Sequence, residues 1–204
     1  MYKKSCFPII NRYDYIENVK RVLFVCGTHG DEPSGVWALQ DFPFSKYTNI
    51  NIVVCQMNPC GVIQNIREHP NLNLDLNRTY NKSILQNEII KKLVMESDII
   101  VDFHEGWDYH IVNKTSIGSS LQTNKLHDIC EFIIKKLNET IIDNNKHFVI
   151  SDTPIIKGSL REFCNEKEKS YILVETTRVE DKLERIRKCK MIIHYVLKII
   201  KNSQ

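Results

Sequence analysis

The chain has 204 residues, 42% of them hydrophobic and 26% charged, so it is long enough to bury a core and should form one globular domain over residues 1–204. Its formal net charge of +3 is too small to indicate a nucleic-acid partner. No segment approaches the roughly 20 apolar residues of a membrane span, and the first residues lack the apolar stretch of a signal peptide.

Apolar runs alternate with segments of helical periodicity along the chain. The expected strands are 21–26, 50–56, 98–104, 147–150 and 170–175. The expected helices are a short one opening at Pro33-Ser34, one capped by Ser83, one within 121–138 and a last one over about 180–201. This alternation predicts a single α/β/α domain with a central mixed, mostly parallel sheet.

The seven cysteines are scattered, and no Cys-x-x-Cys pair occurs. Cys26 and Cys55 lie inside apolar runs, where a thiol behaves as a small hydrophobic side chain. An odd, scattered set of cysteines favours a reducing compartment over a disulfide scaffold. We therefore expect a cytoplasmic protein.

Three polar motifs follow or end predicted strands. His29-Gly30-Asp31-Glu32 follows the first run, His104-Glu105 ends the run at 98–104, and Glu175 ends the last. Open α/β sheets form their binding crevices at such strand ends. Two imidazoles and one carboxylate can hold a zinc ion with one position open for water, and a further carboxylate can take the proton of that water.

Each motif alone also has a structural interpretation. Taken alone, the first motif is more simply a glycine-rich turn with a helix-capping acid, and His104 a core histidine. Glu175 alone is either a solvent-facing acid at the end of a strand or an acid aimed into the crevice. Asp102 and Glu105 are candidates to orient an imidazole, although Glu105 is equally well explained as a surface residue.

The polar stretch 58–82 is long for a loop in a compact domain, and such loops are usually functional or disordered. It contains Arg67 and the sequence Asp75-Leu76-Asn77-Arg78. A guanidinium beside an amide is suited to binding a carboxylate bidentately. The alternative is that Arg78 pairs with Asp75 at the surface and Arg67 is a rim charge. For Arg161, recognition of an acidic side chain and a surface role are equally compatible with the sequence.

Taken together and in order, these motifs form a specific pattern over about residues 21–176. The series is Gly27-Thr28-His29-Gly30-Asp31-Glu32, Asn58-Pro59-Cys60-Gly61, Arg67, Asp75-Leu76-Asn77-Arg78, Asp102-Phe103-His104-Glu105, Gly158-Ser159-Leu160 and Val174-Glu175-Thr176. It resembles the zinc carboxypeptidase superfamily, and especially its succinylglutamate desuccinylase/aspartoacylase branch.

The resemblance implies a role for each matching residue. It implies one zinc ion per chain, held by His29, Glu32 and His104. It implies that Glu175 is the general base and that Arg67 polarises the scissile carbonyl. It further implies that Asn77 and Arg78 bind the free carboxylate of the substrate.

The implied activity is zinc-dependent hydrolysis of an amide bond next to a free carboxylate. The substrate would be a small carboxylate-bearing amide or peptide, and the enzyme an N-acyl amino acid deacylase or a metallocarboxypeptidase.

Two departures from the resemblance are visible. Digestive carboxypeptidases carry a tyrosine shortly before the segment that matches Gly158-Ser159, whereas residues 152–156 contain none. This disfavours ordinary cleavage of peptide tails. Aspartoacylase and its relatives carry an additional C-terminal domain. Here the chain ends in a helix soon after Glu175, so we expect a minimal catalytic domain with a less enclosed site.

Two other functional classes remain open. One is a catalytically inactive binding module on the same fold, which the presence of Glu175 and Arg67 disfavours. The other is membrane or partner binding by residues 178–201, which hold eight Lys or Arg against three acids and an apolar stripe. We favour packing of that stripe against the sheet and expect no membrane partner.

Overall fold

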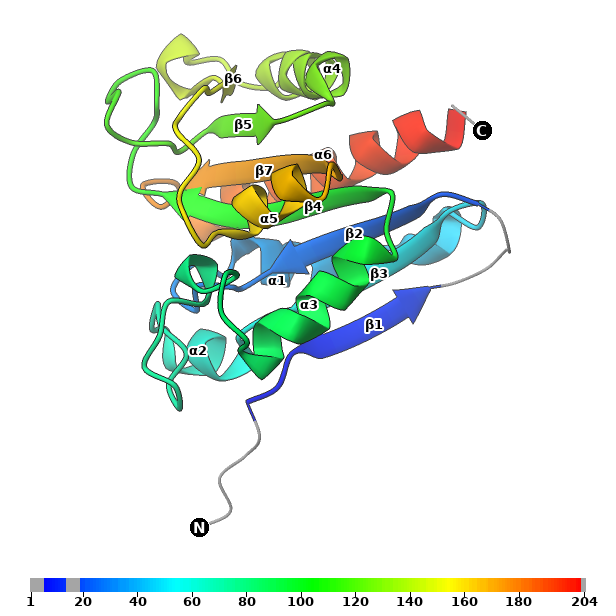
Figure 1. The fold of residues 1–204 in the computed structure, drawn as a ribbon. Helices are drawn as coiled ribbons and strands as arrows, with labels where there is room; N and C mark the ends of the chain where they lie inside the picture. The colour runs from blue at the N-terminus through cyan, green and yellow to red at the C-terminus, as the bar shows by residue number, and fades with distance from the viewer. Residues whose placement is uncertain (1–5, 14–18, 203–204) are drawn as a thin grey trace.

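The computed structural model describes residues 6–13 and 19–202. Within these residues, one seven-stranded sheet is flanked by six α-helices (Figure 1). The strands are β1 (Ile9–Tyr13), β2 (Arg21–Cys26), β3 (Asn51–Gln56), β4 (Ile99–Gly106), β5 (Ser120–Thr123), β6 (Val149–Ile150) and β7 (Ser170–Thr177). The helices are α1 (Ser34–Gln40), α2 (Pro59–Gln64), α3 (Leu85–Met95), α4 (His127–Asn138), α5 (Leu160–Glu166) and α6 (Lys182–Asn202).

The sheet is mixed and mostly parallel, as the sequence predicts. Its order is β1-β3-β2-β4-β7-β5-β6. The pairs β3–β2, β2–β4, β4–β7 and β5–β6 are parallel, whereas β1 and β5 pair antiparallel with β3 and β7. Strands β2, β4 and β7, which precede or contain the three polar motifs, are therefore adjacent and point the same way.

The strand side chains divide between two cores, one on each face of the sheet. Alternation in β2 sends Phe24 to one face and Leu23 to the other, and both are fully buried. Helices α1, α4 and α6 cover the first face, and α3 and α5 cover the second (Figure 1). The predicted α/β/α arrangement of one domain is thus confirmed.

The predicted elements differ from the structure in several details. Strand β1 was not predicted, because it is an edge strand that pairs only with β3 and exposes Ile9 and Ile10. The segment 121–138 begins with β5, since the short polar sequence of residues 120–123 shows no apolar run, and α4 begins only at His127. Ser83 does not cap α3, which begins at Leu85 without a side-chain cap.

The apolar stripe of the C-terminal helix packs against the sheet, as favoured above. Cys189, Ile193, Val196 and Ile200 of α6 are buried in the same core as β2 and β4. Among the described residues, no helix has the length and apolar character needed to cross a bilayer.

The predicted long loop contains two short helices, α2 and a 3₁₀ turn over Leu76–Arg78. A disulfide between Cys6 and Cys60 ties the start of α2 to the segment before β1. His69 Nε2 and Asn71 Nδ2 of the same loop contact the carbonyl oxygen and the sulfur of Cys6. The sequence analysis did not predict this bridge; the other five cysteines are free and buried, so the chain is not a disulfide scaffold.

We predict that reduction of this disulfide lowers thermal stability. The two cysteines are 54 residues apart, and the loop-entropy model assigns a closure of this length about 4 kcal/mol. For a domain of this size the melting temperature should fall on the order of 10 °C. Thermal unfolding with and without a phosphine reductant measures this. A Cys60→Ser variant is the control, because it cannot form the disulfide. It should melt at the temperature of the reduced parent, both with and without the reductant. Equal melting of the parent in both buffers would contradict the prediction.

Candidate active site

The three polar motifs meet at the carboxyl ends of β2, β4 and β7. His29 and Glu32 lie on the loop that leaves β2, and His104 is the sixth residue of β4. Glu175 of β7 is the register partner of His104. All four side chains are buried, with exposed fractions of 3–4%. The expectation that strand ends bring these residues together is correct.

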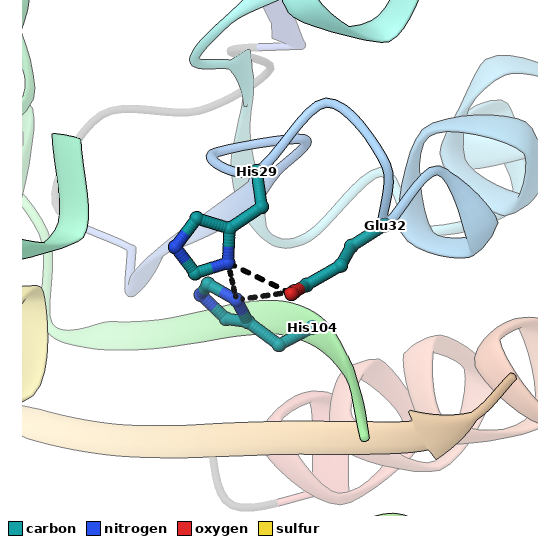
Figure 2. A group of neighbouring side chains, drawn as sticks. All are labelled: His29, Glu32 and His104. Atoms are coloured by element: carbon teal, nitrogen blue, oxygen red, sulfur yellow. Dashed lines mark hydrogen bonds and ion pairs between the residues drawn. The ribbon is translucent and has the colours of Figure 1, made fainter. Parts of the chain in front are cut away.

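Figure 2 shows His29, Glu32 and His104 pointing toward one common point. His29 Nδ1 lies 2.9 Å from Glu32 Oε1, His104 Nδ1 lies 2.8 Å from Glu32 Oε2, and the two Nδ1 atoms are 3.2 Å apart. Two ligands at 2.0–2.1 Å from a tetrahedral zinc are about 3.3 Å apart. The donor atoms are therefore spaced nearly as a zinc ion requires.

In each of the two histidines, the second ring nitrogen, Nε2, donates a hydrogen bond to an aspartate. His104 Nε2 donates to Asp102 Oδ2 over 3.2 Å, and His29 Nε2 donates to Asp75 Oδ1 over 3.0 Å. Tyr171 holds Asp102 in turn by donating its hydroxyl to Oδ2 over 2.8 Å. Such carboxylate–histidine pairs fix the tautomer and ring orientation of metal ligands.

These pairs leave the Nδ1 lone pairs of both histidines facing a carboxylate. Acceptors at such separations repel one another unless a cation lies between them, and that cation is either a proton on Nδ1 or a metal ion. The three residues thus fit a divalent metal by donor type, spacing and protonation.

The charges around this cluster shift its pKa values strongly. Burial alone would raise the pKa of Glu32, but hydrogen bonds and charge from His104 and His29 lower it well below its usual range. Burial alone would lower the pKa of His104, yet Asp102 and Glu32 raise it well above the ordinary value. Burial raises the pKa of Glu175, with His104 opposing the shift and Glu32 adding to it. The cluster therefore stabilises added positive charge.

Two glycines and an asparagine hold the loop that carries His29 and Glu32. A Cβ on Gly30 would lie 2.0 Å from the Gly61 carbonyl carbon, so the loop packs directly on the backbone of α2. Asn58 caps α2 by accepting from Gly61 N over 3.0 Å, and its own N–H donates to the Gly27 carbonyl over 3.0 Å. The Asn-Pro-x-Gly motif is therefore explained by its support of this loop.

The predicted substrate residues lie at the same pocket. A pocket of about 200 Å³ is lined by Arg67, Asn77 and Arg78 together with the three clustered residues and Glu175. Arg67 donates from Nη1 to Glu32 Oε1 over 3.0 Å and from Nε and Nη2 to Asp75 Oδ2. The expected local pair of Asp75 with Arg78 is long, at 4.0 Å. Asp75 instead accepts hydrogen bonds from His29 and Arg67.

Gly158 fixes the turn that presents Asn77 and Arg78. It adopts φ +76°, and a Cβ there would lie 2.5 Å from the Arg78 carbonyl oxygen. The Asn77 amide oxygen accepts from Leu160 N over 2.9 Å, which leaves its NH₂ group for the pocket. Arg161 also lines this pocket, so it is not a simple surface residue; it donates to Gln122 and to the Thr153 carbonyl.

Glu105 does not orient an imidazole. Its carboxylate is buried and accepts from Ser34 N over 2.7 Å and from Arg185 Nη1, so it anchors α1 and α6 to β4. Its backbone N–H donates to Glu32 Oε2 over 3.2 Å.

Sequence reasoning did not identify two groups at this site. Asp75 was read as a partner of Arg78, and only the fold brings it to His29, 46 residues away. Arg178 follows β7 and reaches Glu32, although its position at a strand end, three residues after Glu175, was a usable signal.

Fold and site together define an α/β domain with a candidate metal centre at the carboxyl ends of its central strands. The family model of the succinylglutamate desuccinylase/aspartoacylase catalytic domain matches residues 18–133, and the chain belongs to this family. No curated protein sequence matches the chain.

Several solved structures share this fold at low sequence identity. Helicobacter pylori cell shape determinant Csd4, bound to a tripeptide, superimposes with a TM-score of 0.82 at 15% identity, covering 95% of this chain and 55% of Csd4. A putative metallopeptidase from Shewanella amazonensis gives a TM-score of 0.71 at 14% identity, covering 94% and 81% of the two chains. The chain thus spans about half the length of Csd4.

We predict that Asp102→Asn weakens divalent-metal binding by roughly 10- to 100-fold, the usual cost of removing the acid behind a ligating histidine. The asparagine amide has the same shape but carries no negative charge to attract the N–H of His104 Nε2. Competition with a chelating dye measures the affinity. Glu162→Gln is the control, because this acid caps a backbone N–H at Gly158 and contacts neither histidine. An unchanged affinity in Asp102→Asn would show that the pair does not support the ligand.

Proposed function

We propose that this chain is a zinc-dependent hydrolase that cleaves an amide bond next to a free carboxylate, and that residues 1–204 form its catalytic domain. The observation that supports this best is the convergence of His29, Glu32 and His104 within one pocket that Glu175 also lines. Family membership and the metallopeptidase-like fold favour the same chemistry.

In this proposal one zinc ion per chain is held by His29 Nδ1, His104 Nδ1 and the Glu32 carboxylate. Zinc supplies Lewis acidity, and in such sites it lowers the pKa of a bound water to about 7. Two nitrogens, one carboxylate and an open fourth position are the donor set of catalytic zinc. Asp102 and Asp75 hold both rings in the required tautomer.

Glu175 is the general base in this proposal. It accepts a proton from the attacking water and then donates it to the leaving amine, which is the two-step role of one buried carboxylate. Burial raises its pKa, which brings a carboxylate closer to the range needed to take up and return a proton near neutral pH.

Arg67 stabilises the charge that develops on the scissile carbonyl oxygen. Its side chain is 36% exposed, and its Nη1 reaches the ligand cluster itself at Glu32. Because this guanidinium lies next to the cluster, it can donate a hydrogen bond to the carbonyl oxygen of a substrate bound there. Asp75 holds the other side of the same guanidinium and so fixes its direction.

Asn77 and Arg78 bind the free carboxylate of the substrate. Arg78 presents a planar fork at the pocket, and Asn77 adds its amide N–H groups. The substrate is accordingly a small carboxylate-bearing amide or peptide, and the enzyme an N-acyl amino acid deacylase or a carboxypeptidase. Csd4, which shares this fold, is described as a D,L-carboxypeptidase and was solved with mDAP and with a tripeptide, which favours the carboxypeptidase alternative.

The proposed compartment is the cytoplasm. The five free, buried thiols favour it, whereas the disulfide between Cys6 and Cys60 is the feature of the chain that argues for an oxidising environment.

The proposal predicts opposite effects of two substitutions. His29→Ala should lose the zinc, because two protein ligands remain. Glu175→Gln should keep the zinc but lose turnover around a hundredfold or more, since an amide cannot accept the proton of water. Metal analysis after dialysis measures the zinc content of each variant. Turnover is measured on a mixed panel of N-acyl amino acids and peptides, with the products detected by mass. Equal zinc in His29→Ala and the parent would rule out this metal site, and near-normal turnover in Glu175→Gln would place the base elsewhere.

The proposal also predicts how Arg78 and Arg67 differ. Arg78→Lys keeps the charge but gives up the fork, so it should discriminate less than the parent between a substrate and its carboxamide analogue. Arg67→Ala should lose turnover on both analogues alike, because an oxyanion contact forms mainly in the transition state. Steady-state kinetics with both analogues on the three proteins tests this. A parent that cleaves acid and amide equally well would exclude carboxylate anchoring.

A further inference from the structure

Arg178 connects the end of β7 to the loop that carries the predicted metal ligands. Its backbone N–H donates to the Gly106 carbonyl over 2.9 Å, which continues the pairing of β7 with β4 by one residue. Its Nη2 lies 3.0 Å from Asp31 Oδ2 and 3.2 Å from Glu32 Oε1. One guanidinium nitrogen thus contacts two adjacent acids of the loop.

The guanidinium of Arg178 is itself held from the other side. It lies over the ring of Trp107, 4.7 Å from the ring centre, and Trp107 follows β4 directly. The tryptophan is 75% exposed, whereas the arginine side chain is only 19% exposed. The aromatic face therefore covers the cation and restricts its rotamers.

Arg67 and Arg178 both contact Glu32 Oε1, but their surroundings differ. Arg67 is the more exposed of the two and has its other contacts on Asp75, within its own loop. Arg178 instead contacts the end of β4, at Gly106 and Trp107, and the loop after β2, at Asp31 and Glu32. If Arg67 turns to the substrate, as the proposed function requires, Arg178 still contacts Glu32.

We propose that Arg178, stacked on Trp107, is a positioning residue that fixes the Glu32 carboxylate for metal binding. This proposal rests on the proposed function, since it assumes that Glu32 is a metal ligand. A carboxylate that binds a metal through one oxygen has its second oxygen free to rotate, and a donor on that oxygen fixes the geometry of the first.

Charge and geometry make opposite predictions for the loss of Arg178. If the guanidinium acted only through its positive charge, its removal would strengthen the binding of a dication. If the guanidinium positions Glu32, its removal weakens metal binding. Asp31 and Glu32 then lose the cation between them, and repulsion between the two carboxylates moves Glu32 out of place. Asp31 Oδ1 already lacks a hydrogen-bond partner, so this acid depends on Arg178. We expect positioning to dominate.

The test measures the affinity of each purified variant for the metal alone. Arg178→Met should bind Zn²⁺ about 10- to 100-fold more weakly than the parent, as for other residues that support a metal ligand. Arg178→Lys should recover part of this loss. Trp107→Leu, a milder change at an exposed side chain, should weaken binding about threefold. The Co²⁺-substituted variants should show shifted d–d absorption bands, because these bands report ligand geometry rather than fold stability.

Arg161→Met is the matched control. It removes one arginine from the same pocket, but Arg161 bonds to Gln122 and the Thr153 carbonyl instead of the ligands. Its Zn²⁺ affinity and Co²⁺ spectrum should match those of the parent. Parent-like or tighter binding by Arg178→Met, with an unchanged spectrum, would overturn the proposal while leaving the zinc site intact. A parent that binds no zinc would overturn the proposed function, and this inference with it.

Discussion

The burial of Glu32 between two buried histidines is the constraint on which the site depends. A carboxylate at 4% exposure must be paired on every side, because an uncompensated buried charge costs several kcal/mol. Here both oxygens are engaged: Oε1 contacts His29, Arg67 and Arg178, and Oε2 contacts His104 and the Glu105 backbone N–H. These partners come from four separate segments of the chain: the loop after β2, the loop that carries Arg67, β4 and the end of β7. The strand order that brings β2, β4 and β7 side by side is thus what makes the buried carboxylate possible.

The histidines extend this network outward, one to a core and the other to the loop that carries Arg67. Asp102 connects His104 to Tyr171, a fully buried side chain of the core between β4 and α5. Asp75 connects His29 to the loop that carries Arg67 and Arg78. One ring is therefore held by the rigid sheet and the other by a more exposed loop. Loss of order in that loop would change the direction of the His29 ring while leaving His104 in place.

The sequence allowed the sheet, both layers of helices and the four buried site residues to be predicted, because each rests on local pattern: an apolar run, a helical period, or a motif at the end of a run. What could not be predicted depends on contacts distant in sequence. Strand β1 is stable only through pairing with β3, and its exposed isoleucines show no alternation to detect. Asp75 has an arginine three residues away, so the local ion pair was the simpler interpretation, and only the folded chain shows that His29 and Arg67 are nearer partners. Asp102 was a better candidate because it and His104 lie two residues apart on one strand and so share a face.

Asp75 also links the two halves of the proposed chemistry. Oδ1 accepts from His29 Nε2 and from the Asn77 backbone N–H, and Oδ2 accepts from Arg67. The same carboxylate thereby orients a proposed metal ligand, the proposed oxyanion residue and the turn that presents the proposed substrate residues. Burial alone would raise its pKa, but His29 and Arg67 hold it below the ordinary range, so Asp75 is ionised at neutral pH. The Asp-Leu-Asn-Arg motif therefore acts as one unit: its arginine, the proposed substrate residue, lines the pocket, and its aspartate holds both His29, a proposed metal ligand, and Arg67. A substitution of Asp75 would affect metal binding and substrate binding together, whereas substitutions of Arg78 and Asp102 would separate them.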